Sequence, residues 1–181
     1  VMQLANIGNM ALSEADYREV IRCKTALLFE AATHTGALLA QEADAAQDAG
    51  NIEILRKFGL HFGLAYQLVD DWLDYAGTTK TMGKNVGDDL AEGKLTLPLI
   101  QALKVAPAAD QALITHALQN KSQEHMSEIL AIVEKSGALA YTHAAAVTET
   151  NLALACLAQL PDNPYRTALS TLATFSLSRL A

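Results

Sequence analysis

The segment from Ile52 to Tyr75 constrains the fold more than any other part of this sequence. Its large apolar residues are Ile52, Leu55, Phe58, Leu60, Phe62, Leu64, Tyr66, Leu68, Val69 and Leu73. On a helix they occupy all sides instead of one stripe, which is typical of a helix buried at the centre of a protein. The chain is also rich in Ala and Leu and only 6% aromatic, a composition that favours helices. We therefore expect an all-α fold.

Periodicity and end signals divide the chain into about seven helices, which predicts a helical bundle. Ser13 has the character of an N-cap, and Pro98 suits the first turn of a helix. Residues 76–93 contain four glycines and are expected to form an ordered loop. No internal repeat or linker is present, which indicates one domain. The expected helices cover residues 13–39, 52–75, 98–104, 108–118, 122–135, 137–160 and 165–180.

The bulk properties exclude several classes of protein. The net charge is −7, which argues against nucleic acid as a partner because phosphate backbones bind basic surfaces. Cys23 and Cys156 are isolated thiols, as in proteins of a reducing compartment. No apolar run is long enough for a transmembrane segment, and the first residues lack the basic region of a signal peptide. A cytoplasmic location is expected.

Three aspartates share one side of the central helix. Gln67, Asp70, Asp71 and Asp74 are three or four residues apart, so they lie along the same face. Like charges repel one another, and anions are disfavoured near a helix C-terminus. Their neighbours are large and apolar, and carboxylates near a core need partners. A solvated acidic face is the plain alternative, but the apolar flanks favour a bound cation.

The segment that follows supplies positive charge. Lys84 lies between two glycines, and Lys94 directly follows Gly93, so both side chains can approach diphosphate oxygens closely. The acids do not have the alternating spacing of an EF-hand, and no Walker A sequence occurs. Their arrangement instead suits Mg²⁺ ions whose remaining ligands come from a diphosphate. The residues therefore indicate a magnesium-diphosphate site.

Several motifs occur in the order typical of one enzyme family. Lys24-Thr25, "FGLAYQLVDDWLDY", "GKNVGDDLAEGKLTLPL" and "PDNPYRTAL" resemble the trans-isoprenyl diphosphate synthases, above all the bacterial octaprenyl diphosphate synthases that make quinone side chains. The resemblance covers essentially the whole chain and implies the helical bundle of isoprenoid synthases. It implies that an allylic diphosphate, such as farnesyl diphosphate, loses pyrophosphate. The resulting cation is then attacked by isopentenyl diphosphate. A Mg²⁺ cofactor and a homodimer or other homo-oligomer are implied as well.

The resemblance also implies roles for individual residues. Asp70 would be a magnesium ligand, and Asp71 and Asp74 would ligate the metal through water or hold the shape of the site. Asp88 and Asp89 would orient the lysine-bearing loop. The implied catalytic residues are Lys24, Thr25, Gln67, Lys84 and Lys94. The implied substrate-binding residues are Gln3, Lys24, Lys84 and Lys94.

The sequence departs from the family in one respect. These synthases carry two aspartate-rich motifs, and the first lies upstream of the residues that match Gln3. We therefore expect residues 1–181 to be the C-terminal part of a single polyprenyl synthase domain, without its N-terminal helices and inactive alone. A non-catalytic shortened subunit, which dimerises with or regulates a full-length synthase, is the alternative. A helical interaction domain with surface acids also stays open, whereas "GKNVGDDLAEGK" disfavours a head-to-head terpene synthase.

Overall fold

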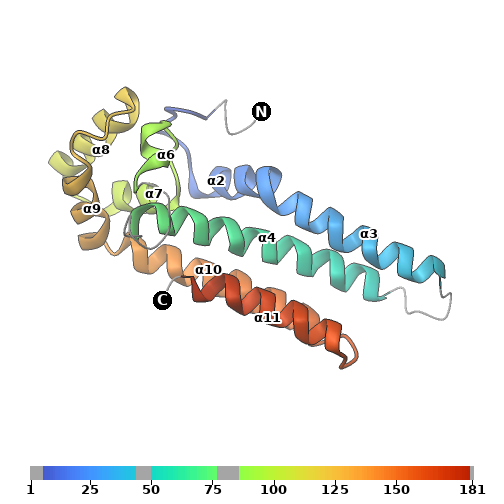
Figure 1. The fold of residues 1–181 in the computed structure, drawn as a ribbon. Coiled ribbons are helices and arrows are strands. Elements are labelled where there is room, and N and C mark those ends of the chain that lie inside the picture. The colour runs from blue at the N-terminus through green and yellow to red at the C-terminus, as the bar shows by residue number, and fades with distance from the viewer. Residues whose placement is uncertain (1–5, 44–49, 77–85, 180–181) are drawn as a thin grey trace. The chain divides into compact units, whose positions relative to one another are not determined.

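The computed structural model describes residues 6–43, 50–76 and 86–179, and every regular element in these ranges is a helix (Figure 1). The expectation of an all-α fold is confirmed. Within these ranges, no helix combines the length and the apolar character needed to cross a membrane. The chain divides into two compact units. Unit 1 contains the described residues up to Val20 together with Leu68–Ala144, and unit 2 contains Ile21–Gln67 and the residues from Ala145 onward. The single domain stays a prediction.

Unit 1 is built around three mutually contacting helices, α7 (Leu97–Val105), α8 (Ala108–Asn120) and α9 (Met126–Lys135). It also contains α2 (Glu14–Ile21, except its last residue), α6 (Asp88–Ala91), the end of α4 (Gly50–Ala76) and the start of α10 (Ala138–Leu157). Pro98 lies in the first turn of α7, where its missing N–H costs no helical hydrogen bond. The buried apolar side chains of α7, α8 and α9 include Leu97, Leu99, Ile100, Ile114, Leu118, Ile129 and Val133.

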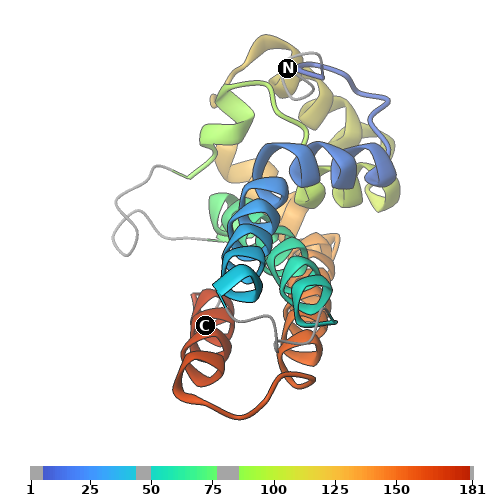
Figure 2. The ribbon, with the colours of Figure 1, turned by 90° about the vertical axis from the view of Figure 1, so that its right-hand side faces the viewer.

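The long helices of unit 2 run side by side (Figure 1 and Figure 2). They are α3 (Leu27–Ala43), the first part of α4, the second part of α10, and α11 (Pro164–Ser178). Their core is a cluster formed by Phe58, Phe62, Ala153, Cys156, Leu157 and Ala173. The ring of Phe29 meets that of Phe62 edge to face, with centroids 5.0 Å apart, which is a favourable aromatic geometry.

Two glycines of α4 allow α3 and the residue before it, Ala26, to approach closely. A Cβ atom on Gly59 would lie 2.5 Å from the carbonyl oxygen of Phe29, and one on Gly63 would lie 2.6 Å from the Cα atom of Ala26. Neither distance is compatible with a side chain. The absence of Cβ atoms at these positions therefore sets the separation between α4 and the chain before it.

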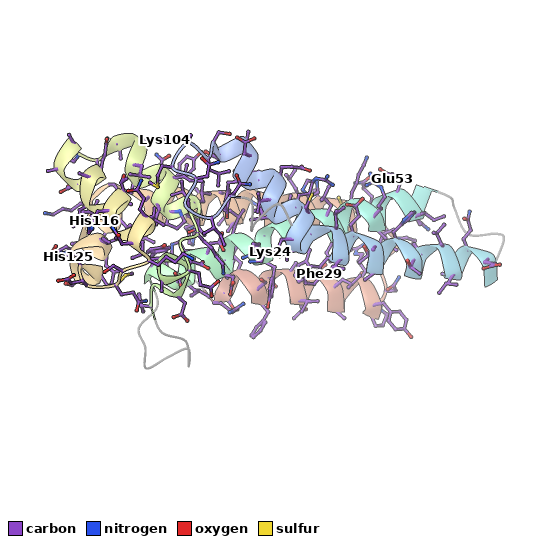
Figure 3. The ribbon with its side chains drawn as sticks, turned by 90° about the horizontal axis from the view of Figure 1, so that it is seen from above. Lys24, Phe29, Glu53, Lys104, His116 and His125 are labelled. Atoms are coloured by element: carbon purple, nitrogen blue, oxygen red, sulfur yellow. The ribbon has the colours of Figure 1, made fainter. Side chains whose placement is uncertain are left out.

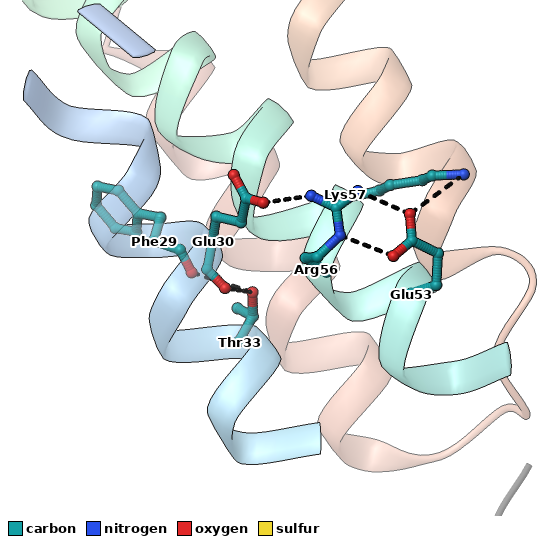
Figure 4. Close-up of polar contacts among 6 residues, drawn as sticks. All are labelled: Phe29, Glu30, Thr33, Glu53, Arg56 and Lys57. Atoms are coloured by element: carbon teal, nitrogen blue, oxygen red, sulfur yellow. Dashed lines mark hydrogen bonds and ion pairs between the residues drawn. The ribbon is translucent and has the colours of Figure 1, made fainter. Parts of the chain in front are cut away.

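Charged residues join the same two helices at the surface (Figure 4). Nη1 of Arg56 on α4 pairs with Glu30 on α3. The Nε and Nη2 atoms of Arg56 each lie 2.7 Å from an oxygen of the Glu53 carboxylate. Lys57 lies 3.7 Å from Glu53. The hydrogen bonds from Arg56 lower the pKa of Glu53 to about 2. Arg56 therefore connects α3 to the beginning of α4.

The helix expected over residues 13–39 differs from the structure in its middle. Between α2 and α3 lies a π-helix, η1 (Arg22–Ala26), which periodicity did not predict. Single π-helical turns occur frequently at functional sites, and this one contains Lys24 and Thr25. The loop expected over 76–93 contains the short helix α6, and the helix expected from residue 122 begins at Met126 because a turn precedes it.

Candidate functional site

We use the name acidic group for the three aspartates near the C-terminus of α4, which are Asp70, Asp71 and Asp74. All belong to unit 1. Asp71 is only 3% exposed, and its Oδ2 atom accepts a 2.5 Å hydrogen bond from the phenol of Tyr17 on α2. Burial raises the pKa of Tyr17 well above its usual value, and the charge of Asp71 raises it further. The phenol therefore stays neutral and acts as a hydrogen-bond donor to the carboxylate.

Asp74 binds the beginning of α6. Its Oδ1 atom accepts the backbone N–H of Asp88 at 3.1 Å, and its Oδ2 atom accepts that of Asp89 at 3.2 Å. The N–H of Gly87 also bonds to the backbone carbonyl of Asp74, at 2.9 Å. Burial raises the pKa of Asp74 to about 7, and the negative charge of Asp89 adds to the effect of burial. A nearby cation would favour the ionised form of this carboxylate.

The acidic group fits a magnesium ion that receives most of its ligands elsewhere. Carboxylate oxygens are suitable donors, and Mg²⁺ is commonly held by one or two carboxylates together with phosphate oxygens and water. Asp71 and Asp74 each accept hydrogen bonds from protein donors, and Asp70 and Asp74 are both partly exposed. Among the described residues, no three His, Cys, Asp or Glu side chains are arranged to hold a metal by themselves. These side chains fit an edge of a metal site, not a complete enclosure.

Lys94 lies just after α6 and pairs with two carboxylates. It follows Gly93, whose φ of 73° lies in the left-handed region that glycine adopts without strain. Its ammonium lies 3.2 Å from Asp89 and 2.6 Å from Glu92. Burial disfavours the charged form of Lys94, but these two carboxylates outweigh burial and raise its pKa. Lys94 thus remains a cation in the turn after α6.

Thr25 and Gln67 meet in unit 2. The Thr25 hydroxyl, on η1, donates a 2.6 Å hydrogen bond to Oε1 of Gln67, a side chain of α4 that is 4% exposed. Lys24 precedes Thr25 and is exposed (Figure 3). No acidic side chain pairs with its ammonium in the part of the chain that the structure describes. Lys24 is therefore available for an anionic ligand.

The structure covers most of the residues that the resemblance implicated. Gln3 and Lys84 lie outside the described residues. The hydrogen bond between Tyr17 and Asp71 was not predicted from the sequence. A tyrosine at an apolar position of a helix is usually interpreted as a core residue. The available signal was its hydroxyl, since a buried tyrosine usually finds a hydrogen-bond partner.

Comparisons with known proteins agree on one family. A family model described as polyprenyl synthetase matches residues 1–135. The chain is 42% identical over 180 residues to an octaprenyl diphosphate synthase of Haemophilus influenzae, and it covers 53% of that protein. It is 41% identical to a geranyl-diphosphate-specific all-trans-nonaprenyl-diphosphate synthase of Rhodobacter capsulatus, of which it covers 54%.

A solved structure gives the same result. The polyprenyl synthase of Caulobacter crescentus, complexed with calcium and isoprenyl diphosphate, matches 99% of the chain with a TM-score of 0.88 and 41% identity. The match covers 54% of that protein. The chain therefore spans about half the length of the relatives that it matches.

Proposed function

The chain belongs to the polyprenyl synthetase family, and from this premise we propose that it forms part of a prenyltransferase that joins isopentenyl diphosphate to an allylic diphosphate. The acidic group is the observation that carries the proposal. It gathers three carboxylates at one end of a buried helix, and Lys94 is held nearby in the same unit by Asp89. Such a combination suits a divalent cation and a diphosphate together.

Magnesium, when bound, would neutralise charge on the leaving diphosphate. Asp70, which is partly exposed, would hold it directly, as the family resemblance implies. Asp71 and Asp74 would keep the helix end in shape through their bonds to Tyr17 and to the amides of α6. Lys24, Lys84 and Lys94 would contact diphosphate oxygens, and Gln3 would line the substrate pocket.

Thr25 and Gln67 suit a different task, the stabilisation of positive charge on the allylic carbon. The Thr25 proton is committed to Gln67, so the hydroxyl oxygen presents lone pairs, not a proton, to its surroundings. An oxygen fixed in this way stabilises a cation without first having to reorient. The 2.6 Å bond between the two side chains supports this role.

The names of the relatives support a more specific proposal. Octaprenyl and nonaprenyl diphosphate synthases are among them, so we propose a long-chain product that serves as a quinone side-chain precursor. A homo-oligomer and a cytoplasmic location complete the proposal. Because the chain spans about half of these relatives, we expect it to be inactive by itself.

Binding of inorganic pyrophosphate to the chain, measured by calorimetry with and without Mg²⁺, tests the proposal. We expect binding that depends on Mg²⁺ and that weakens about tenfold or more in Asp70→Ala. Asp110→Asn, which removes a carboxylate of unit 1 outside the acidic group, is the matched control and should bind normally. Affinity that ignores both Mg²⁺ and Asp70→Ala would contradict the proposal.

A further inference from the structure

Tyr17 makes a contact to which neither the motifs nor the comparisons assign a role. It lies on α2, 54 residues before Asp71 in the sequence, and it is 2% exposed. Its phenol donates to a carboxylate that is itself almost completely buried. A buried carboxylate is expensive to desolvate unless donors surround it, so this hydrogen bond helps to hold Asp71 in place.

The helix that carries Tyr17 is fixed independently of Asp71. The Ser13 hydroxyl accepts the N–H of Asp16 at 3.1 Å and caps the first turn of α2. Glu14 accepts hydrogen bonds from Lys104 on α7, at 3.3 Å, and from the phenol of Tyr141 on α10, at 2.8 Å. The phenol of Tyr17 is therefore presented from an element that is attached to two other helices of unit 1.

From this geometry we infer that Tyr17 is a positioning residue of the acidic group: its phenol holds the Asp71 carboxylate in one orientation, so that α4 presents its acids to a divalent cation in a fixed arrangement. The inference rests on the proposed function. Removal of the hydrogen-bonding partners that surround a metal site typically changes metal affinity 10- to 100-fold. Tyr17 would act through Asp71 and would not itself contact metal or substrate.

A purely structural role for the pair predicts a different result. Removal of the phenol would then lower thermal stability, because a buried carboxylate loses a donor, and any loss of metal binding would only follow the loss of folded protein. The same helix offers a direct comparison in Tyr75, which is also buried but whose phenol donates no hydrogen bond to a carboxylate of the acidic group. Tyr17→Phe and Tyr75→Phe each remove one buried hydroxyl from unit 1, but only the first removes a donor from the acidic group.

The test is to titrate the 181-residue chain and both variants with Mn²⁺, detected by electron paramagnetic resonance, in the presence of inorganic pyrophosphate. Thermal unfolding of each protein is recorded in metal-free buffer. We expect Tyr17→Phe to weaken Mn²⁺ binding by about tenfold or more and Tyr75→Phe to leave it within about twofold. A chain that also carries Asp71→Ala, which removes the acceptor, should show no further loss from Tyr17→Phe, because the two residues act together.

Each outcome decides a separate question. If the unmodified chain binds no Mn²⁺, the proposed function of the acidic group fails and the inference fails with it. If the chain binds Mn²⁺ and Tyr17→Phe binds equally well, the inference alone is overturned. A loss of affinity that merely follows the loss of thermal stability, to the same degree in Tyr75→Phe, would also overturn it. Weakened binding in Tyr17→Phe alone supports the inference.

Discussion

Gly63→Ala tests the close approach of α4 to η1. The new Cβ atom would lie 2.6 Å from Cα of Ala26, whereas ordinary contact begins at 3.4 Å, so the two segments must separate by about 0.8 Å. Overpacking of this kind costs about 1–3 kcal/mol. The same shift lengthens the 2.6 Å bond between Thr25 and Gln67 beyond the normal range for hydroxyl donors, which loses about 1 kcal/mol more.

Helix propensity acts in the opposite direction. Alanine is favoured over glycine within a helix by about 1 kcal/mol, so the net destabilisation from Gly63→Ala is about 2 kcal/mol. For a chain of this length, that corresponds to a decrease of roughly 4–8 °C in Tm, measured by circular dichroism or calorimetry.

Gly36→Ala is the matched control. Gly36 lies within α3, and a Cβ atom there would meet nothing within 4 Å. The same substitution at this position should stabilise the chain by about 0.5–1 kcal/mol, because only helix propensity changes. If Gly63→Ala raised Tm as Gly36→Ala does, the close approach of α4 to η1 would be refuted.

Three further substitutions test other contacts. Arg56→Met removes the partner of the half-buried Glu30 and should lower the free energy of unfolding in urea by about 1 kcal/mol, and by less in high salt. An equal loss of stability from Lys57→Met would contradict this prediction. Gly59→Ala should lower Tm at least as much as Gly63→Ala, because the new Cβ atom would lie 2.5 Å from the backbone oxygen of Phe29. An unchanged Tm would refute this prediction. Asp74 has a folded-state pKa of about 7, above its usual 3.8, so metal-free stability should fall as the pH rises between these values and stay low above them. Asp74→Asn removes the charge but accepts only one of the two N–H groups, so its effect on the stability of the metal-free chain should be more favourable at pH 8 than near pH 4, by roughly 1–2 kcal/mol after allowance for solvent screening; a pH-independent effect would rule this out.

The acidic group could be predicted from the sequence because its geometry is local. Asp70, Asp71 and Asp74 lie within two turns of one helix, and the helical period alone places them together. The fold class could be predicted for the same reason, because the apolar residues of α4 occupy all sides of the helix, as is typical of a buried helix.

Contacts between distant parts of the chain could not be predicted in this way. Thr25 and Gln67 are 42 residues apart, and only the family resemblance brought them together. Tyr17 and Asp71 are 54 residues apart, and no sequence pattern links the two residues. The π-helix η1 was missed because no residue in Arg22–Ala26 breaks a helix, and α6 because four residues are too few to show a period.

We propose that this chain supplies the acidic, diphosphate-binding part of a prenyltransferase site. The most direct measurement joins it to the half of the Haemophilus influenzae octaprenyl diphosphate synthase that it does not match. Incorporation of isopentenyl diphosphate onto farnesyl diphosphate is then followed with Mg²⁺. We expect the joined protein to be active, the chain alone to be inactive, and Asp70→Ala in the joined protein to lower kcat by at least about 100-fold. A folded joined protein without activity, or one that Asp70→Ala leaves unchanged, would contradict the claim.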